Sequence, residues 1–286
     1  MQPNFGRLPL VFIMALTTQI QAADFRDQLG LQLWSLRGEY AKNPGLALDQ
    51  VKAYGITEVE IATTGPGTAA QLAEALKVRG LAVSGGLFSY DLLKHDLPGV
   101  IRDAQTLGLR YVVCSVVPVP AQQFDAKLAQ QVAGEFNLWG ASLKAAGIRF
   151  GYHLHGNEFQ WVNGGQEENA FDLLVRATDP ALVCYEMDVF WVTHAGQNPV
   201  QLLNKYPDRW LALHLKDRRL GALTGLSAPK PPPADQVPVG TGQIDWPSVL
   251  RAAQNVGVKY YFVEDESPDP LRNIPLSLAY LRALKP

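Results

Sequence analysis

The 286-residue chain has a formal net charge of −2, with 47% hydrophobic and 18% charged residues. This length suits one large α/β barrel or two small domains, and the hydrophobic content is sufficient for a packed core. A protein that grips a nucleic-acid backbone usually carries a surplus of basic residues, so the balance excludes nucleic acid as an expected partner. Cys114 and Cys184 are too few for a disulfide framework and lie in apolar runs. We expect two buried thiols, with a pocket-lining Cys114 as the alternative.

The N-terminal segment has the pattern of a secretory signal peptide. Arg7 precedes an apolar run at 8–16, and a polar stretch with small residues follows at 17–23. The apolar run is too short for a transmembrane helix, so we expect no stable membrane anchor. Residues 1–23 are therefore predicted to be a cleaved signal, and 24–286 a periplasmic or secreted domain. The alternative is that this run is an ordinary first helix.

From Leu29 onward, short β-rich runs alternate with segments whose apolar residues recur at helical spacing. The eight predicted strands are 29–34, 57–62, 81–88, 110–117, 148–155, 181–190, 209–217 and 259–265. Gly55, Gly80, Gly108 and Gly147 follow helical segments and are predicted to end them. Asp245 is predicted to cap the helix that begins at Trp246.

Eight β/α units within 24–286 predict a single-domain (β/α)₈ TIM barrel. A doubly wound open sheet is the alternative fold. It normally needs a glycine-rich phosphate turn after the first strand, and residues 35–45 contain no such turn. The irregular segment 218–243 follows the seventh strand, and we interpret it as a partial lid.

Four successive predicted strands end in histidines or carboxylates. These side chains are His153 and His155, Glu186 and Asp188, His214 and Lys216 with Asp217, and Glu264. The chemistry of a TIM barrel lies at the C-terminal ends of its strands. Alternate residues of a strand share a face, so His153 pairs with His155, Glu186 with Asp188, and His214 with Lys216.

This combination of side chains predicts a divalent metal site. Imidazole with carboxylate oxygens suits Mn²⁺, Zn²⁺, Co²⁺ or Fe²⁺, and the lack of a cysteine ligand argues against structural zinc. A single histidine at a strand end is more often a hydrogen-bonded structural residue, but Asp188 and Glu264 on neighbouring strands favour a ligand role for His214. Lys216 is expected to stabilise an oxyanion or to pair with a carboxylate, and Asp217 to orient Lys216 or His214.

Several segments resemble the sugar phosphate isomerase/epimerase-like barrels, also called the xylose isomerase-like or AP endonuclease 2 superfamily. The matching segments are GLQLWSLR (30–37), VEIA (59–62), YHLHGNEF (152–159), 187–203, HLKD (214–217), 237–246 and FVEDES (262–267). The resemblance covers residues 29–286 and implies one divalent metal held by Asp188, His214 and Glu264. The epimerases supply a fourth ligand from a glutamate within strand five, where this chain has His153. Relatives with a segment like YHLHGNEF offer the glutamate that corresponds to Glu158, so we predict Glu158 as the fourth ligand.

The resemblance also implies chemistry beside a carbonyl group, in which a base removes a proton and the metal polarises the carbonyl. His155 or His153 is the predicted base, with Lys216 and Glu264 as the other catalytic groups. Gln32, Trp34 and Glu60 are candidates for binding sugar hydroxyls and the sugar face, together with His153 and Lys216. The alternative for the first three is that they are ordinary rim residues.

The main functional prediction is a sugar isomerase or epimerase acting on a non-phosphorylated sugar or keto-sugar. The second hypothesis is a lyase that cleaves 3-keto-glycosides by β-elimination, and the third is a non-catalytic carbohydrate-binding barrel. Retention of Asp188, His214 and Glu264 argues against the third hypothesis. A phosphodiester-cleaving role is disfavoured, because the chain has too few ligands for several zinc ions. The sequence leaves the first two hypotheses, the metal and the oligomeric state open.

Overall fold

The computed structural model describes residues 24–62, 67–119, 123–162, 164, 167–226, 228 and 230–285. The predicted signal peptide, residues 1–23, lies outside the described residues. No helix among the described residues is long and apolar enough to span a membrane.

The predicted barrel is confirmed. The eight parallel strands are β1 (Leu29–Gln32), β2 (Glu58–Ala62), β3 (Ala82–Phe88), β4 (Tyr111–Cys114), β5 (Arg149–Leu154), β6 (Val183–Asp188), β7 (Trp210–Leu215) and β10 (Tyr260–Val263). They close in the order β1-β10-β7-β6-β5-β4-β3-β2, so the first and last strands of the barrel are neighbours. A short antiparallel pair, β8 (Asp217–Arg218) and β9 (Gln236–Val237), lies outside the barrel.

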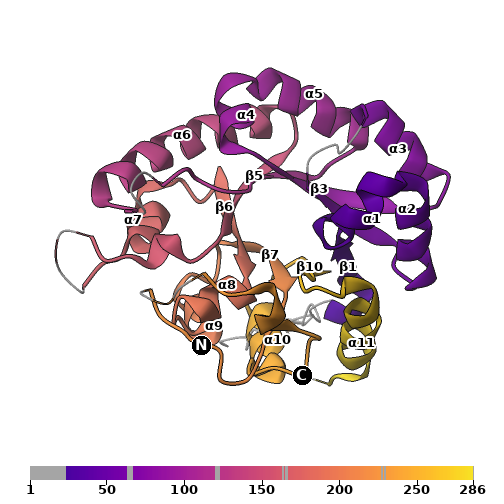
Figure 1. Ribbon diagram of the computed structural model, residues 1–286. Coiled ribbons are helices and arrows are strands. Elements are labelled where there is room, and N and C mark those ends of the chain that lie inside the picture. The colour runs from indigo at the N-terminus through magenta and orange to yellow at the C-terminus, as the bar shows by residue number, and fades with distance from the viewer. Residues whose placement is uncertain are drawn as a thin grey trace, which may run out of the picture.

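Helices cover the outside of the barrel (Figure 1). The α-helices are α1 (Arg37–Lys42), α2 (Pro44–Ala53), α3 (Ala69–Lys77), α4 (Tyr90–His95), α5 (Leu97–Leu107), α6 (Ala126–Ala145), α7 (Ala170–Ala177), α8 (Val189–His194), α9 (Pro199–Lys205), α10 (Trp246–Asn255) and α11 (Pro270–Ala283). Short 3₁₀ helices are η1 (Phe25–Gln28), η2 (Leu33–Leu36), η4 (Asn157–Phe159) and η5 (Pro233–Asp235). Asp245 caps α10 as predicted, and its side chain accepts a hydrogen bond from the Ser248 backbone.

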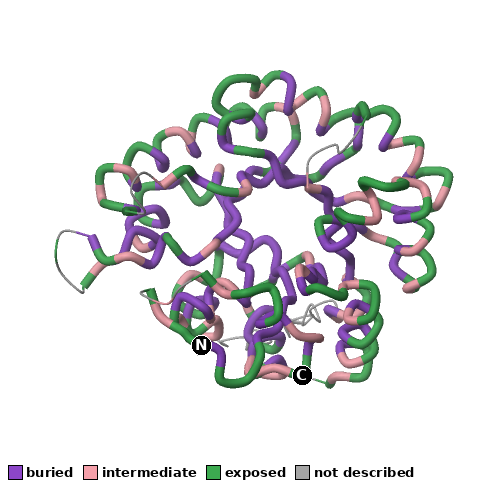
Figure 2. Tube along the Cα trace, in the orientation of Figure 1, coloured by how far each residue is buried: buried purple, intermediate pink, exposed green. Residues whose placement is uncertain are grey.

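The main core lies between the strands and the helices, where the buried residues gather around the barrel wall (Figure 2). Its aromatic side chains interlock: the Phe136 ring of α6 lies 5.2 Å from Phe150 and 5.1 Å from Tyr152 of β5. Both cysteines are buried, as predicted. This outer core fixes the strand positions and so fixes what the strand ends present.

The segment after β7 is held to the barrel by Asp217, and this corrects the prediction for that residue. Asp217 was expected to orient Lys216 or His214. Its carboxylate instead accepts hydrogen bonds from the backbone of Gly240 and Gly242 and from the indole of Trp246. An aspartate at the start of β8 is well placed to satisfy backbone donors of the loop that follows the paired strand β9.

Candidate metal centre and active site

A cavity of about 1030 Å³ opens at the C-terminal ends of the strands. Its lining includes Gln32, Trp34, His153, His155, Lys216 and Glu264, which are six of the residues that the sequence singled out. A pocket of this size at this end of a TIM barrel is the expected place for catalysis.

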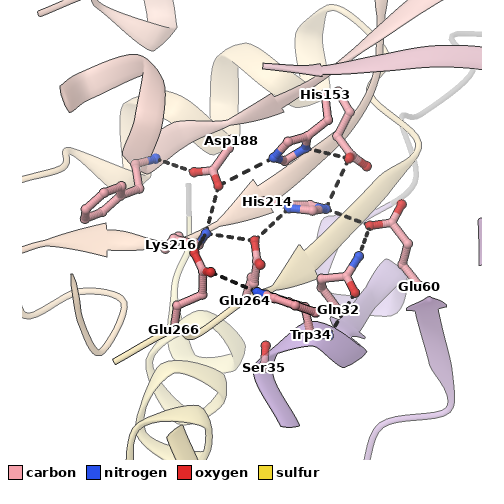
Figure 3. A network of polar contacts seen from close by, with 12 residues as sticks. Gln32, Trp34, Ser35, Glu60, His153, Asp188, His214, Lys216, Glu264 and Glu266 are labelled. Carbon is pink, nitrogen blue, oxygen red and sulfur yellow. Dashed lines mark hydrogen bonds and ion pairs between the residues drawn. The ribbon is translucent and has the colours of Figure 1, made fainter. Parts of the chain in front are cut away.

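Four neighbouring strands each bring one potential ligand to the cavity floor (Figure 3). His153 lies in β5, Asp188 ends β6, His214 lies in β7, and Glu264 follows β10. His153 Nε2 lies 3.8 Å from Asp188 Oδ2, and His214 Nδ1 lies 2.9 Å from Glu264 Oε2. The nearest ligand atoms of His153, Asp188 and His214 all lie within 4.8 Å of one another. All four side chains are buried or nearly so.

Lys216, which directly follows β7, joins this group from two residues beyond His214. Its ammonium lies 3.0 Å from Asp188 Oδ2, 2.9 Å from Glu264 Oε2 and 2.8 Å from Glu266 Oε2. Burial alone would lower the pKa of Lys216, but these three carboxylates raise the pKa well above its usual value. Lys216 is therefore a fixed positive charge on the cavity wall.

A second layer of polar side chains lies directly beneath the first. Glu60 of β2 and Glu186 of β6 are both 0% exposed. His214 Nε2 lies 2.7 Å from Glu60 Oε2 and 3.3 Å from Glu186 Oε2, while His153 Nδ1 lies 2.8 Å from Glu186 Oε2. Glu60 also accepts hydrogen bonds from Gln32 Nε2 at 2.7 Å and Tyr111 Oη at 2.6 Å. Each of the two histidines thus has one ring nitrogen within hydrogen-bond distance of a carboxylate in this second layer. Its other ring nitrogen faces Asp188 or Glu264 in the first layer.

The buried charges shift the pKa values of the cluster in opposite directions. Burial raises the pKa of Asp188 to about 6, and burial with the nearby Glu186 raises the pKa of Glu60 to about 7. Burial alone would raise the pKa of Glu264, but Lys216 and His214 bring it well below its usual value. Such opposed shifts within one cleft are typical of functional sites.

The two strand-five histidines are held neutral. Burial lowers the pKa of His153 well below its usual range, and the neighbouring His214 lowers it further. Burial also lowers the pKa of His155, with smaller contributions from His153 and Lys216. A neutral imidazole can bind a metal ion or accept a proton, so both residues are suited to the roles predicted for them.

The residues present fit a divalent metal ion. Asp188 Oδ1 accepts hydrogen bonds from two backbone amides of α8, whereas buried Oδ2 accepts none from the described residues and lies 3.0 Å from the Lys216 ammonium. An oxygen left in this state, beside His153 Nε2 and close to His214 Nδ1, is a suitable ligand atom. His153, Asp188, His214 and Glu264 are the side chains that would hold the ion.

The structure does not bring Glu158 to this group. The chain turns at Gly156, which has a left-handed φ of 95°, into the 3₁₀ helix η4. This turn directs the Glu158 carboxylate back to the Tyr152 hydroxyl and to the Gly156 backbone amide, 2.8 Å away. Both carboxylate oxygens are thereby engaged on the outer side of β5, and His153 takes the strand-five place at the cluster.

The remaining predicted residues divide between the cavity and the layer beneath it. Gln32, Trp34 and His155 line the cavity, and Trp34 Nε1 donates to Glu266 Oε1 at 2.9 Å. Glu60 lies beneath the cavity floor and is not part of the lining, because its position in β2 is one layer lower in the barrel.

Sequence reasoning assigned no role to three residues of the site: Glu186, Glu266 and Tyr111. It placed Glu186 on the same face as Asp188 without giving it a function, and Glu266 lies two positions after Glu264, so the period-2 rule could have identified it as well. Tyr111 opens β4 and crosses the barrel to Glu60, a contact with no sequence signal.

The comparisons with known proteins agree with the barrel fold. A family model described as xylose isomerase-like TIM barrel matches residues 48–284. The chain belongs to this family. A curated relative, the inosose dehydratase of Clostridium botulinum, is 25% identical over 263 residues, which cover 82% of this chain and 85% of that protein.

Solved structures support the same assignment. A sugar phosphate isomerase/epimerase from Parabacteroides distasonis is 26% identical with a TM-score of 0.72, covering 94% of this chain and 98% of that one. The IOLI protein, solved with a bound zinc atom, is 15% identical with a TM-score of 0.67, covering 89% of this chain and 96% of that one. At that identity the second likeness shows the fold alone.

Proposed function

We propose that this protein is a metal-dependent lyase that removes a proton beside the ketone of a small polyhydroxylated substrate and then expels a β substituent. One observation carries the proposal. A neutral imidazole, His155, and a cationic amine, Lys216, line the same cavity as His153 and Glu264, two of the four potential ligands. The curated relative that is an inosose dehydratase favours elimination as the outcome.

His155 is the proposed base. Its ring centroid lies 4.6 Å from that of His153 and 5.8 Å from that of Trp191, so the imidazole is held between a cluster residue and an aromatic wall. In this step a ring nitrogen of His155 takes the proton from the carbon next to the ketone. The C–H electron pair forms the carbon–carbon double bond of an enolate.

Lys216 stabilises the negative charge that the first step creates. The Lys216 ammonium is placed to balance the negative charge of the enolate oxygen, and it also hydrogen bonds to Glu266, which lies on the cavity wall. When the enolate collapses to an enone, the bond to the β oxygen breaks. The leaving oxygen takes the proton that His155 abstracted and departs as water or an alcohol, which returns His155 to its neutral form.

When bound, the divalent ion supplies polarisation of the ketone oxygen, which acidifies the neighbouring carbon. The zinc found in the IOLI protein supports a metal in this family of barrels. Gln32 and Trp34, on the opposite wall, are placed to contact hydroxyl groups and a ring face of the substrate.

Isomerisation or epimerisation is the second candidate, favoured by the similarity to the Parabacteroides distasonis sugar phosphate isomerase/epimerase. It shares the first step and differs in the return of the proton. The family resemblance implies two ligand glutamates for that return, and this chain has His153 at one of the two places. Here only one glutamate, Glu264, remains of that pair, together with His153. Because the second glutamate that would return the proton on the opposite face is absent from that place, this pair favours elimination.

The test is proton exchange measured with product analysis. The protein loaded with Mn²⁺, Co²⁺ or Zn²⁺ is incubated in D₂O with an inosose and with keto-hexoses, and NMR follows the carbon next to the ketone. Deuterium uptake with formation of an enone supports the lyase, whereas uptake with recovered isomers supports the second candidate. The His155→Gln variant should lose exchange, while His194→Gln, on the same cavity wall, should keep it. Absence of exchange with every metal would reject both candidates.

We also propose that residues 1–23 direct export and are removed. The support is the sequence pattern of that segment. Mass spectrometry of protein from the periplasm of an expression host should find a chain that begins near Asp24, and an intact cytoplasmic chain would contradict export.

A further inference from the structure

We infer that Glu60 and Glu186 are positioning residues that set which nitrogen of His214 and His153 faces the metal. The inference rests on the proposed metal-dependent function and concerns the layer beneath the ligands. Its observation is independent of the cavity: both carboxylates are fully buried and lie against ring nitrogens that face away from the other ligands.

Both ring nitrogens of His214 face carboxylates: Nε2 lies 2.7 Å from Glu60 Oε2, and Nδ1 lies 2.9 Å from Glu264 Oε2 in the ligand cluster. If the Nε2 proton stays on the ring and bonds to Glu60, the Nδ1 lone pair is available to the ion. A metal-bound histidine that donates its other N–H to a carboxylate is a common arrangement, because the carboxylate fixes the ring and increases its basicity.

Glu60 is itself fixed as an acceptor. The Trp34 backbone amide donates to Gln32 Oε1 at 3.0 Å, which turns Gln32 Nε2 toward Glu60 Oε2. The Tyr111 hydroxyl occupies Glu60 Oε1. Because Gln32 can only donate from this nitrogen, Glu60 Oε2 accepts from both Gln32 and His214. The chain of contacts therefore runs from the backbone of η2 through Gln32 and Glu60 to the ligand nitrogen.

Glu186 acts in the same way on the other ring. His153 Nδ1 lies 2.8 Å from Glu186 Oε2, and His153 Nε2 faces Asp188 Oδ2. Glu186 Oε2 also lies 3.3 Å from His214 Nε2, so it bridges the two imidazoles from below. Each of the two buried carboxylates thus hydrogen bonds to a histidine nitrogen. These bonds offset the free-energy cost of burying two acids in the barrel interior.

A second metal ion is the competing account of this layer. Glu60, Glu186 and His214 also have ligand atoms within 4.8 Å of one another, and Glu186 Oε1 has no hydrogen-bond partner among the described residues. One feature favours the positioning role. Both oxygens of Glu60 already accept hydrogen bonds, from Gln32, Tyr111 and His214.

The test measures Co²⁺ binding to the full-length protein rather than turnover. Glu60→Met keeps the side-chain length and removes the acceptor, whereas Glu60→Gln keeps an oxygen that can accept from His214. Loss of such a partner typically weakens metal affinity by roughly 10–100-fold. We expect Glu60→Met to weaken Co²⁺ binding in calorimetry to that extent and to alter the cobalt d–d absorption. Glu60→Gln should recover most of the affinity.

Glu186→Met should behave like Glu60→Met, since it frees the His153 ring. Glu266→Gln is the matched control, because it removes a carboxylate charge beside the cluster, and Glu266 bonds to Lys216 and Trp34 rather than to a histidine nitrogen. It should retain Co²⁺ affinity close to that of the unmodified protein.

Three results would overturn the inference. Equal Co²⁺ affinity in Glu60→Met and the unmodified protein, with a changed melting temperature of the metal-free form, would make Glu60 purely structural. Two ions per chain by elemental analysis, with one lost in Glu60→Met, would make the layer a second metal site. A protein that binds no divalent ion at all would reject this inference and the proposed function together, whereas the first two results leave the function in place.

Discussion

The interior of the barrel has two layers that differ in almost every property although the same strands build them. The lower layer lies beneath all the polar side chains of the site, Glu60 and Glu186 included. It is largely apolar, and its buried residues are Leu87, Tyr111, Val113, Cys184, Leu211, Ala212 and Phe262. The upper layer contains the histidines, carboxylates and lysine of the site. On β6, β7 and β10 the two layers lie two residues apart, from Cys184 to Glu186, Ala212 to His214 and Phe262 to Glu264. Period-2 alternation places both sets inward.

The lower layer contributes mainly to stability, and the upper layer mainly to activity. In the lower layer glycines make room for rings: a Cβ on Gly85 would lie 2.0 Å from the Tyr111 ring, and one on Gly30 would lie 2.6 Å from Phe262. The fit is one of volume, so it stabilises the barrel. In the upper layer several charges are taken out of water, which costs free energy and is retained where function requires it. Substitutions in the two layers should therefore be separable by what they change.

The largest expected effect is on activity, from a change in the upper layer. Asp188→Asn replaces the uncoordinated Oδ2 of a proposed ligand without changing its size. Since a polarising metal contributes several kcal/mol to transition-state stabilisation, we expect kcat/KM for proton exchange to fall on the order of 10³–10⁴-fold. Asp265→Asn is the control, because Asp265 is buried but bonds to Ser267. Equal losses in both variants would place the effect on folding rather than on the site.

The sequence predicted the strands and most of the site because both follow from local patterns. All eight strands and the inward placement of Asp188, His214, Lys216 and Glu264 come from apolar runs and period-2 alternation. Glu158 escaped this reasoning, because its direction depends on the left-handed turn at Gly156 and on the hydroxyl of Tyr152. These are tertiary contacts that spacing does not encode.

The depth of a residue in the barrel was equally inaccessible from sequence. Glu60 and Gln32 occupy paired positions of β2 and β1, yet Gln32 reaches the cavity and Glu60 lies below its floor. The stagger of tilted strands determines that difference, and it is a property of the closed barrel. For the same reason the contact between Tyr111 and Glu60 could be found only in the structure.

The next effect is on the stability of the metal-free protein. Lys216→Met leaves Asp188 and Glu264 without their shared ammonium in a buried setting, and such losses typically cost about 3–5 kcal/mol. We expect the lower end, about 3 kcal/mol, because His214 remains beside Glu264. Urea unfolding without metal measures it, and saturating Co²⁺ should raise the melting temperature more in this variant than in the unmodified protein.

Lys205→Met is the matched control for that change. Lys205 pairs with Asp172 at 2.7 Å, but its side chain is 53% exposed, so the loss should be below about 1 kcal/mol. Equal unfolding free energies for Lys216→Met and Lys205→Met would mean that the upper layer does not depend on its buried cation.

A smaller effect should come from the lower layer and leave metal binding intact. Gly85→Ala pushes a methyl group into the Tyr111 ring, and overpacking of this kind costs about 1–3 kcal/mol. The measurement is urea unfolding beside a Co²⁺ titration. Gly134→Ala, in α6 with no atom within 4 Å of the added Cβ, should be neutral or stabilising. A Gly85→Ala protein with normal stability but lost Co²⁺ binding would break the separation between the layers.

The smallest effect is expected at the rim, above both layers. Trp34→Phe removes the indole N–H that donates to Glu266 at 2.9 Å and keeps an aromatic face toward the cavity. A hydrogen bond at an exposed site contributes about 0.5–1.5 kcal/mol, so KM should rise by about 2–10-fold with kcat nearly unchanged. Trp161→Phe is the control, because Trp161 is equally exposed, at 45% against 44%, and does not line the cavity. A fall in kcat for Trp34→Phe would instead mean that Glu266 must be held in place for catalysis, which would extend the catalytic layer up to the rim.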